Sequence, residues 1–70
     1  MSREVIKLNV EGMACQHCVL SIQKAVGALK GVNGVEVNLK GKQVTVDYDS
    51  SQVDFETIKN AIEDQGYDVK

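Results

Sequence analysis

The chain has no proline, only one histidine and only two cysteines among its 70 residues. The missing proline argues against a thioredoxin-type redox protein, whose fold carries a cis-proline facing its paired cysteines. No apolar run approaches the length that crosses a bilayer, so direct membrane insertion is not expected. The charged start, Met1-Ser2-Arg3-Glu4, is unlike a signal peptide. With so few cysteines and no leader, the sequence predicts a cytoplasmic protein.

Acidic residues are absent from one stretch of the chain. Residues 12–35 contain none, whereas residues 36–70 contain eight acidic and four basic residues. The two lysines of the first stretch are too few for a nucleic-acid footprint, so no nucleic-acid partner is predicted. They suffice to favour an acidic protein partner, although ordinary solvated lysines explain them equally well. The candidate docking residues are Ser21, Gln23, Lys24 and Lys30.

Apolar residues alternate along some segments and recur at helical spacing along others, which predicts one-sided strands and amphipathic helices. The expected elements are strands at 5–10, 35–39, 44–48 and from 67 onward, and helices at 16–29 and 55–62. The first helix is expected to end in a basic turn at Lys30, before a glycine stop at Gly31. The second is expected to begin after an N-cap at Asp54, with Phe55 in its apolar stripe.

This order of elements predicts a ferredoxin-like βαββαβ sandwich of the α+β class, formed by two split β-α-β units. An antiparallel four-stranded sheet would carry both helices on one face, which agrees with strands that are polar on one side. The composition, 43% hydrophobic and 26% charged, is that of a folded chain, and residues 1–70 are expected to form one domain. Cys15 would lie in the first strand-to-helix loop and Cys18 in the first helical turn.

Cys15 and Cys18 are the residues best suited to chemistry. Residues three apart share a helix face, so two thiols at this spacing converge if the second opens a helix. A helix N-terminus favours thiolates, because it offers unpaired N–H groups and positive potential. Two soft sulfur donors suit a soft, low-coordinate cation, and Cu(I) is the leading candidate. No nucleophile–base pair is evident, so neither a catalytic residue nor an enzymatic activity is predicted.

Other interpretations of the cysteine pair remain open at this point. A redox couple also uses Cys-x-x-Cys at a helix start, but the chain is short for the thioredoxin fold and its strand order differs. A closed zinc site needs four ligands, and Cys15, Cys18 and His17 supply three at most. Inert packing of both cysteines is possible but leaves their spacing unexplained.

The motif Gly12-Met13-x-Cys15-x-x-Cys18 resembles the signature of heavy-metal-associated domains, and the resemblance extends to the closing segment 61–67. It is most similar to the bacterial copper chaperones of that family. The resemblance implies Cu(I) held by both thiolates and passed by ligand exchange to the metal-binding domain of a copper-transporting P-type ATPase, or to a copper-responsive regulator. Alternatives are an excised N-terminal domain of such an ATPase, or a mercury or zinc carrier. Exposed thiolates also allow a copper-bridged homodimer.

Four neighbours of the cysteines are expected to shape the site. Gly12 would serve a backbone bend after the first strand. Met13 is a possible thioether ligand, but family precedent favours packing under the loop. His17 is either a solvent-facing or capping residue, or it tunes the thiolates or contacts a partner. Tyr67 either packs at a strand start or shields the metal, and a tyrosine here resembles the bacterial branch.

Overall fold

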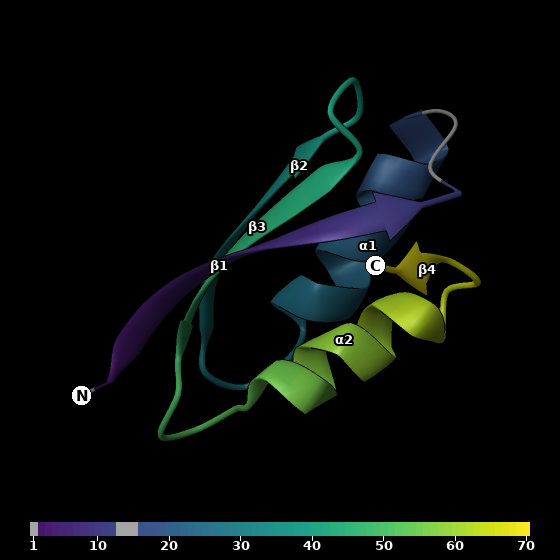
Figure 1. Ribbon diagram of the computed structural model, residues 1–70. Coiled ribbons are helices and arrows are strands. Elements are labelled where there is room, and N and C mark those ends of the chain that lie inside the picture. The colour runs from purple at the N-terminus through teal and green to yellow at the C-terminus, as the bar shows by residue number, and fades with distance from the viewer. Residues whose placement is uncertain (1, 13–15) are drawn as a thin grey trace.

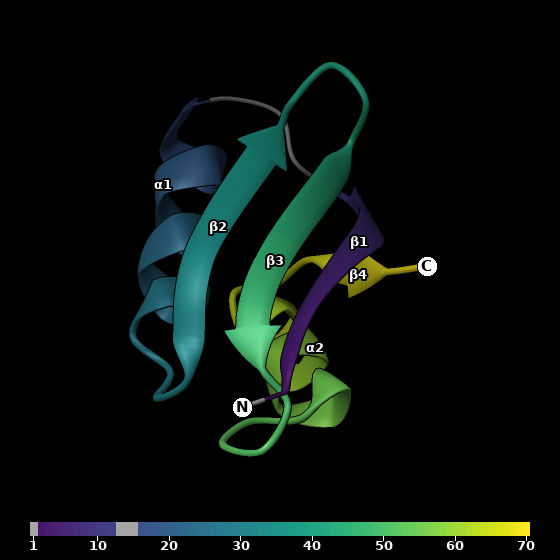
Figure 2. The same ribbon diagram turned by 90° about the vertical axis from the view of Figure 1, so that its left-hand side faces the viewer.

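The computed structural model describes residues 2–12 and 16–70. Its elements are β1 (Arg3–Glu11), α1 (Gln16–Gly27), β2 (Val32–Asn38), β3 (Gln43–Asp49), α2 (Phe55–Glu63) and β4 (Asp68–Val69). The strands form one four-stranded sheet in the order β2-β3-β1-β4, and every neighbouring pair is antiparallel. Both helices lie behind this sheet in Figure 2. The predicted ferredoxin-like βαββαβ sandwich is confirmed.

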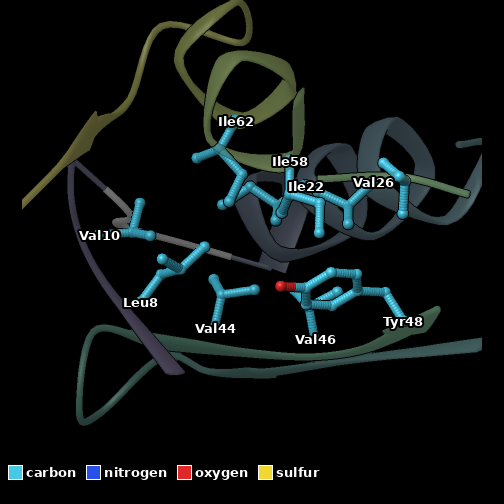
Figure 3. Close-up of a cluster of buried hydrophobic side chains, with 10 residues drawn as sticks. Leu8, Val10, Ile22, Val26, Val44, Val46, Tyr48, Ile58 and Ile62 are labelled. Carbon is cyan, nitrogen blue, oxygen red and sulfur yellow. The ribbon is translucent and has the colours of Figure 1, made fainter. Parts of the chain in front are cut away.

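The core lies between the sheet and the helices, because alternate strand residues point toward the helical layer. In the β1–β3 register Leu8 lies opposite Val44, and both are buried. Each such buried side chain contributes roughly 1.5–3 kcal/mol. Figure 3 shows this cluster, which includes Leu8, Val10, Ile22, Val26, Val44, Val46, Tyr48, Ile58 and Ile62.

The first helix ends earlier than the sequence predicts. It stops at Gly27, and the basic residue of its last turn is Lys24. The prediction that Lys30 lies in that last turn is wrong, since Lys30 belongs to the connection before β2. The backbone tightens after the helix, where Leu29 N donates to Val26 O at 3.1 Å in a bond that spans three residues. A half-buried Leu29 thus continues the apolar stripe outside the helix proper.

The second helix begins where its cap predicts. Asp54 accepts hydrogen bonds from Thr57 N at 2.8 Å and from Thr57 Oγ1 at 2.6 Å. Ile58 and Ile62 are fully buried, but Phe55 is 42% exposed, so its placement in the buried stripe is wrong. Helical side chains lean toward the preceding turn, and the first residue of a helix has no such turn beneath its ring.

The connections divide between the two ends of the sheet. At one end Val10 N donates to Lys42 O at 2.8 Å, which ties β1 to the tip of the β2–β3 hairpin. At the other end Asp49 N donates to Gly31 O at 2.7 Å, which ties β3 to the α1–β2 connection. Helix α1 starts at the first end, near the hairpin tip, and runs toward the second (Figure 1). Neither helix of the described residues combines the length and apolar character of a membrane span.

Candidate metal centre

The start of α1 carries the one predicted ligand that the structure describes. Cys18 is the third residue of a helix that begins at Gln16, so it lies in the first turn, as the sequence predicts. Its side chain is half-buried and packs against the hydrophobic core. Its predicted co-ligand Cys15, and Met13, lie outside the described residues. Within residues 2–12 and 16–70, no three or more His, Cys, Asp or Glu side chains are grouped to hold a metal ion.

The electrostatics at this helix start favour a negative group. The first turn of α1 contains no acidic residue. The first four N–H groups of a helix lack partners within the helix, and their aligned dipoles leave partial positive charge there. His17, the neighbour of Cys18 in the chain, is exposed. The backbone around Cys18 can therefore stabilise a thiolate without an acidic side chain competing for it.

Gly12 and Tyr67 meet where β1 leads into the cysteine motif. Gly12 has a φ of 99°, in the left-handed region that side chains rarely adopt. A Cβ placed on Gly12 would lie 3.3 Å from Tyr67 Cδ1 and 4.0 Å from Tyr67 Cα. Tyr67 itself is half-buried against the core, just before β4. The tyrosine from the far end of the chain thus covers the backbone bend from which the motif departs.

The predicted docking residues do not all lie near Cys18. Ser21 and Gln23 are half-buried on α1, and Lys24 is exposed in its last turn. Lys30 follows the helix at the opposite end of the sheet. A helix of 12 residues is about 18 Å long at roughly 1.5 Å per residue. Lys30 is therefore separated from Cys18 by most of the length of α1, and its docking role stays a prediction.

Two exposed residues at the metal-motif end escaped the sequence analysis. Leu20, two residues after Cys18, is 51% exposed on α1. Leu20 could have been identified from the sequence, because it is an apolar residue that lies outside the periodic stripe of the helix. Lys42 lies in the hairpin tip beside Val10. No local signal places it there, since the contact depends on how β1 and β3 pair.

Comparisons with known proteins agree with this geometry. The model of the heavy-metal-associated domain matches residues 7–68. The copper chaperone CopZ of Staphylococcus haemolyticus (strain JCSC1435) is 54% identical over 63 residues, which are 90% of this chain and 93% of that protein. The structure of a CopZ metallochaperone matches with a TM-score of 0.90 and 49% identity, over 99% of this chain and 100% of that one.

A domain of a transport protein is also similar. The Cu(I)-loaded N-terminal domain of a potential copper-translocating P-type ATPase from Bacillus subtilis has a TM-score of 0.93 and 31% identity. The match covers 97% of this chain and 85% of that one. The family model spans most of the sequence and the relatives align over nearly its full length. The predicted resemblance to this family is thereby confirmed, and the chain belongs to the heavy-metal-associated domain family.

Proposed function

We propose that this protein is a cytoplasmic copper chaperone. It binds Cu(I) through Cys15 and Cys18 and delivers it to the metal-binding domain of a copper-transporting P-type ATPase. The observation that carries the proposal is Cys18 in the first turn of α1, in a chain whose relatives are named copper chaperones. Residues 1–70 act as one domain, and the protein is a carrier rather than an enzyme.

The donor set suits Cu(I) because thiolates are soft ligands and the site is low-coordinate. Two thiolates and one monovalent cation carry a net charge of −1. The N–H groups at the start of α1 offset this charge, helped by the lack of acidic residues in the first turn. His17 remains outside the coordination sphere, and Met13 is not a ligand. Tyr67 limits access of solvent and oxidants to the metal from the Gly12 side.

Delivery follows from a site that does not enclose its metal. A thiolate of the acceptor attacks Cu(I) and forms a third copper–sulfur bond, and one bond to this chain then breaks. A second exchange releases the other thiolate, and copper stays in the Cu(I) state throughout. A copper-responsive regulator with exposed thiolates would receive copper by the same steps. A copper-bridged homodimer of this chain would use the same three-coordinate arrangement.

The proposal predicts that both cysteines are needed for tight binding. Reduced protein is titrated with Cu(I) against a competing chelator, alongside Cys15→Ser and Cys18→Ser. Each serine variant should lose more affinity than the roughly 10–100-fold that removal of an outer-shell residue costs. Met13→Leu serves as the control and should bind as the unmodified protein does. The proposal fails if the unmodified protein cannot compete with the chelator, or if either serine variant binds equally tightly.

A further inference from the structure

One asparagine of the chain is followed by glycine. Asn33 precedes Gly34, whereas the other three asparagines precede the larger residues Val10, Leu39 and Ala61. The backbone nitrogen that follows an asparagine can attack the side-chain amide carbon and close a ring. Glycine favours this attack, because it has no Cβ to crowd the nitrogen and its backbone adopts conformations that other residues avoid. Asparagine is a thermolabile residue, and the sequence makes Asn33 the most reactive of the four.

The backbone around Asn33 is irregular. In the β2–β3 register Val32 lies opposite Tyr48 and Gly34 lies opposite Asp47, so Asn33 is an extra residue without a partner in this ladder. A β-bulge of this kind leaves its extra residue unpaired and bends the strand. β2 is also an edge strand, since β3 is its only neighbour in the sheet of described residues. Asn33 is therefore held less firmly than a paired residue in the extended geometry that slows ring closure.

Gly34 has no structural reason to be glycine. Its φ is not positive, and no atom lies within 4 Å of the position that a Cβ would take. Asn33 and Gly34 are both exposed, and Gly34 lines a shallow hollow with Val5 and Thr45. Water therefore reaches this peptide bond, and the fold would accept a larger residue in place of Gly34.

The side chain of Asn33 contacts a charged neighbour on β3. The pKa of Asp47 lies below its ordinary value, chiefly because Arg3 donates a hydrogen bond to the carboxylate, and Asn33 contributes a further hydrogen bond. Conversion of Asn33 to aspartate would remove this amide donor and place a second carboxylate beside Asp47. Like charges that face one another on neighbouring strands destabilise a sheet.

We propose that Asn33 is a site of spontaneous deamidation in the folded protein. The Gly34 nitrogen forms a bond to Asn33 Cγ, and the bond from Cγ to the amide nitrogen breaks. Ammonia leaves with the proton of the Gly34 nitrogen, and a succinimide ring remains. Water then adds to either carbonyl carbon of the ring, and the ring C–N bond at that carbon breaks. The products are aspartate and isoaspartate, each with one more negative charge than Asn33 and with no change in oxidation state.

The modified chain is expected to keep its metal site and to lose stability. Asn33 is the second residue of β2, next to the end of the sheet where Asp49 N donates to Gly31 O. The metal motif lies at the other end. The affinity for Cu(I) should therefore be unchanged, whereas the modified protein should unfold at a lower urea concentration. The modification itself does not depend on the proposed function.

Peptide mapping of the aged protein tests the proposal. The reduced full chain is incubated at mildly alkaline pH and digested with trypsin, which releases residues 31–40 by cleavage after Lys30 and Lys40. This peptide contains both Asn33 and Asn38, and Asn38 is the internal control because no glycine follows it. Tandem mass spectrometry should locate a carboxyl group in place of the amide at Asn33 alone, in two isomers that chromatography separates. In heavy-oxygen water each product should gain one oxygen from the solvent.

Substitutions at the two residues separate the reaction from its consequence. Gly34→Ala should slow the reaction at least severalfold, and it should fold at least as stably, because glycine weakens the interior of a strand. Asn33→Asp reproduces the added charge, and Asn33→Ser removes the amide without adding charge. Asn33→Asp should unfold at a lower urea concentration than Asn33→Ser, and both should bind Cu(I) as the unmodified protein does.

Four results would overturn the proposal or its consequence. Equal loss of the amide at Asn38, or an unchanged rate in Gly34→Ala, would contradict ring closure at Asn33. Reaction only in the urea-unfolded chain, with Asn33 intact in the folded protein, would contradict a site in the native structure. Equal stability of Asn33→Asp and Asn33→Ser would remove the predicted repulsion from Asp47. Failure of the unmodified protein to bind Cu(I) would instead overturn the proposed function and leave the modification site standing.

Discussion

Tyr67 and Gly12 show how single residues from opposite ends of the chain build the wall of the proposed site. The aromatic ring fills the space that a side chain on residue 12 would need, and the backbone there turns through a φ of 99°. The φ of residue 12 and the nearby ring both disfavour a Cβ atom on this residue. Glycine at residue 12 is thus favoured first by its left-handed backbone conformation and further by the close approach of the Tyr67 ring.

Gly12→Ala is expected to destabilise the fold. The left-handed conformation alone costs a residue with a side chain about 1–2 kcal/mol, and the new methyl group would lie 3.3 Å from Tyr67 Cδ1. Urea unfolding measures the change. Gly27→Ala is the matched control, because nothing lies within 4 Å of its added methyl group and it should unfold no more easily than the unmodified protein. Equal stability of Gly12→Ala and the unmodified protein would contradict this account.

The site could be predicted from the sequence only as far as local spacing reaches. The position of Cys18 follows from its distance to the start of the apolar helical stripe. The position of Lys42 beside Val10 does not, because it depends on the pairing of strands from different halves of the chain. The distance between Lys30 and Cys18 could not be predicted either, because it depends on where α1 ends.

At the scale of elements, helix ends were harder to predict than helix existence. The periodic stripe marks the buried face, which is why Ile58 and Ile62 were predicted correctly. The stripe does not mark how far burial extends toward a helix end, so Phe55, the first residue of α2, was placed in the core although it is exposed. Ends are determined by hydrogen bonds such as the Asp54 cap, and a cap has a sequence signal only when its side chain is a strong acceptor.

The Asp54 cap gives α2 a pH-dependent contribution to stability. Hydrogen bonds from the Thr57 side chain and backbone lower the pKa of Asp54 from 3.8. A carboxylate with a lowered pKa stabilises the fold above its unfolded pKa, and this stabilisation is lost as the pH falls through the folded pKa. Asp54→Ala should therefore unfold at a lower urea concentration at pH 7, and the deficit should shrink below about pH 4.

Asp54→Asn is the matched control, since its side-chain oxygen still accepts from Thr57 N without titrating. It should retain more stability at neutral pH than Asp54→Ala. The cap has no role in stability if Asp54→Ala matches the unmodified protein at pH 7. The ionisation of Asp54 has no role if the stability deficit of Asp54→Ala relative to the unmodified protein persists unchanged in acid.

At the scale of the whole molecule, the antiparallel topology gathers the metal motif, the hairpin tip and the approach to β4 at one end of the sheet. The opposite end is held by Asp49, whose pKa is lowered to about 2, chiefly by hydrogen bonds from Ser51. At the end with the motif, Lys40 and Lys42 lie on the hairpin side, and Glu11 and Asp68 lie on the β4 side. The fold thus separates the tightly hydrogen-bonded end of the sheet at Asp49 from the end that we propose meets the acceptor.

The fold could be predicted from the sequence because each strand has one apolar face and each helix one apolar stripe. These faces fit together in one way, with both helices on the same side of the sheet (Figure 2). The apolar faces of the strands and helices do not determine the partner, the bound metal or the rate of metal exchange. The partner, the metal and the rate depend on a few exposed residues whose identity hardly affects the packing.

The most direct test of the account is the kinetics of copper transfer from the loaded protein to the acceptor's apo metal-binding domain, in the presence of a chelator. Direct ligand exchange predicts that the rate of copper arrival rises in proportion to acceptor concentration and exceeds the spontaneous loss of copper to the chelator. A rate that is independent of acceptor concentration and equal to that spontaneous loss would contradict delivery by contact between the two proteins.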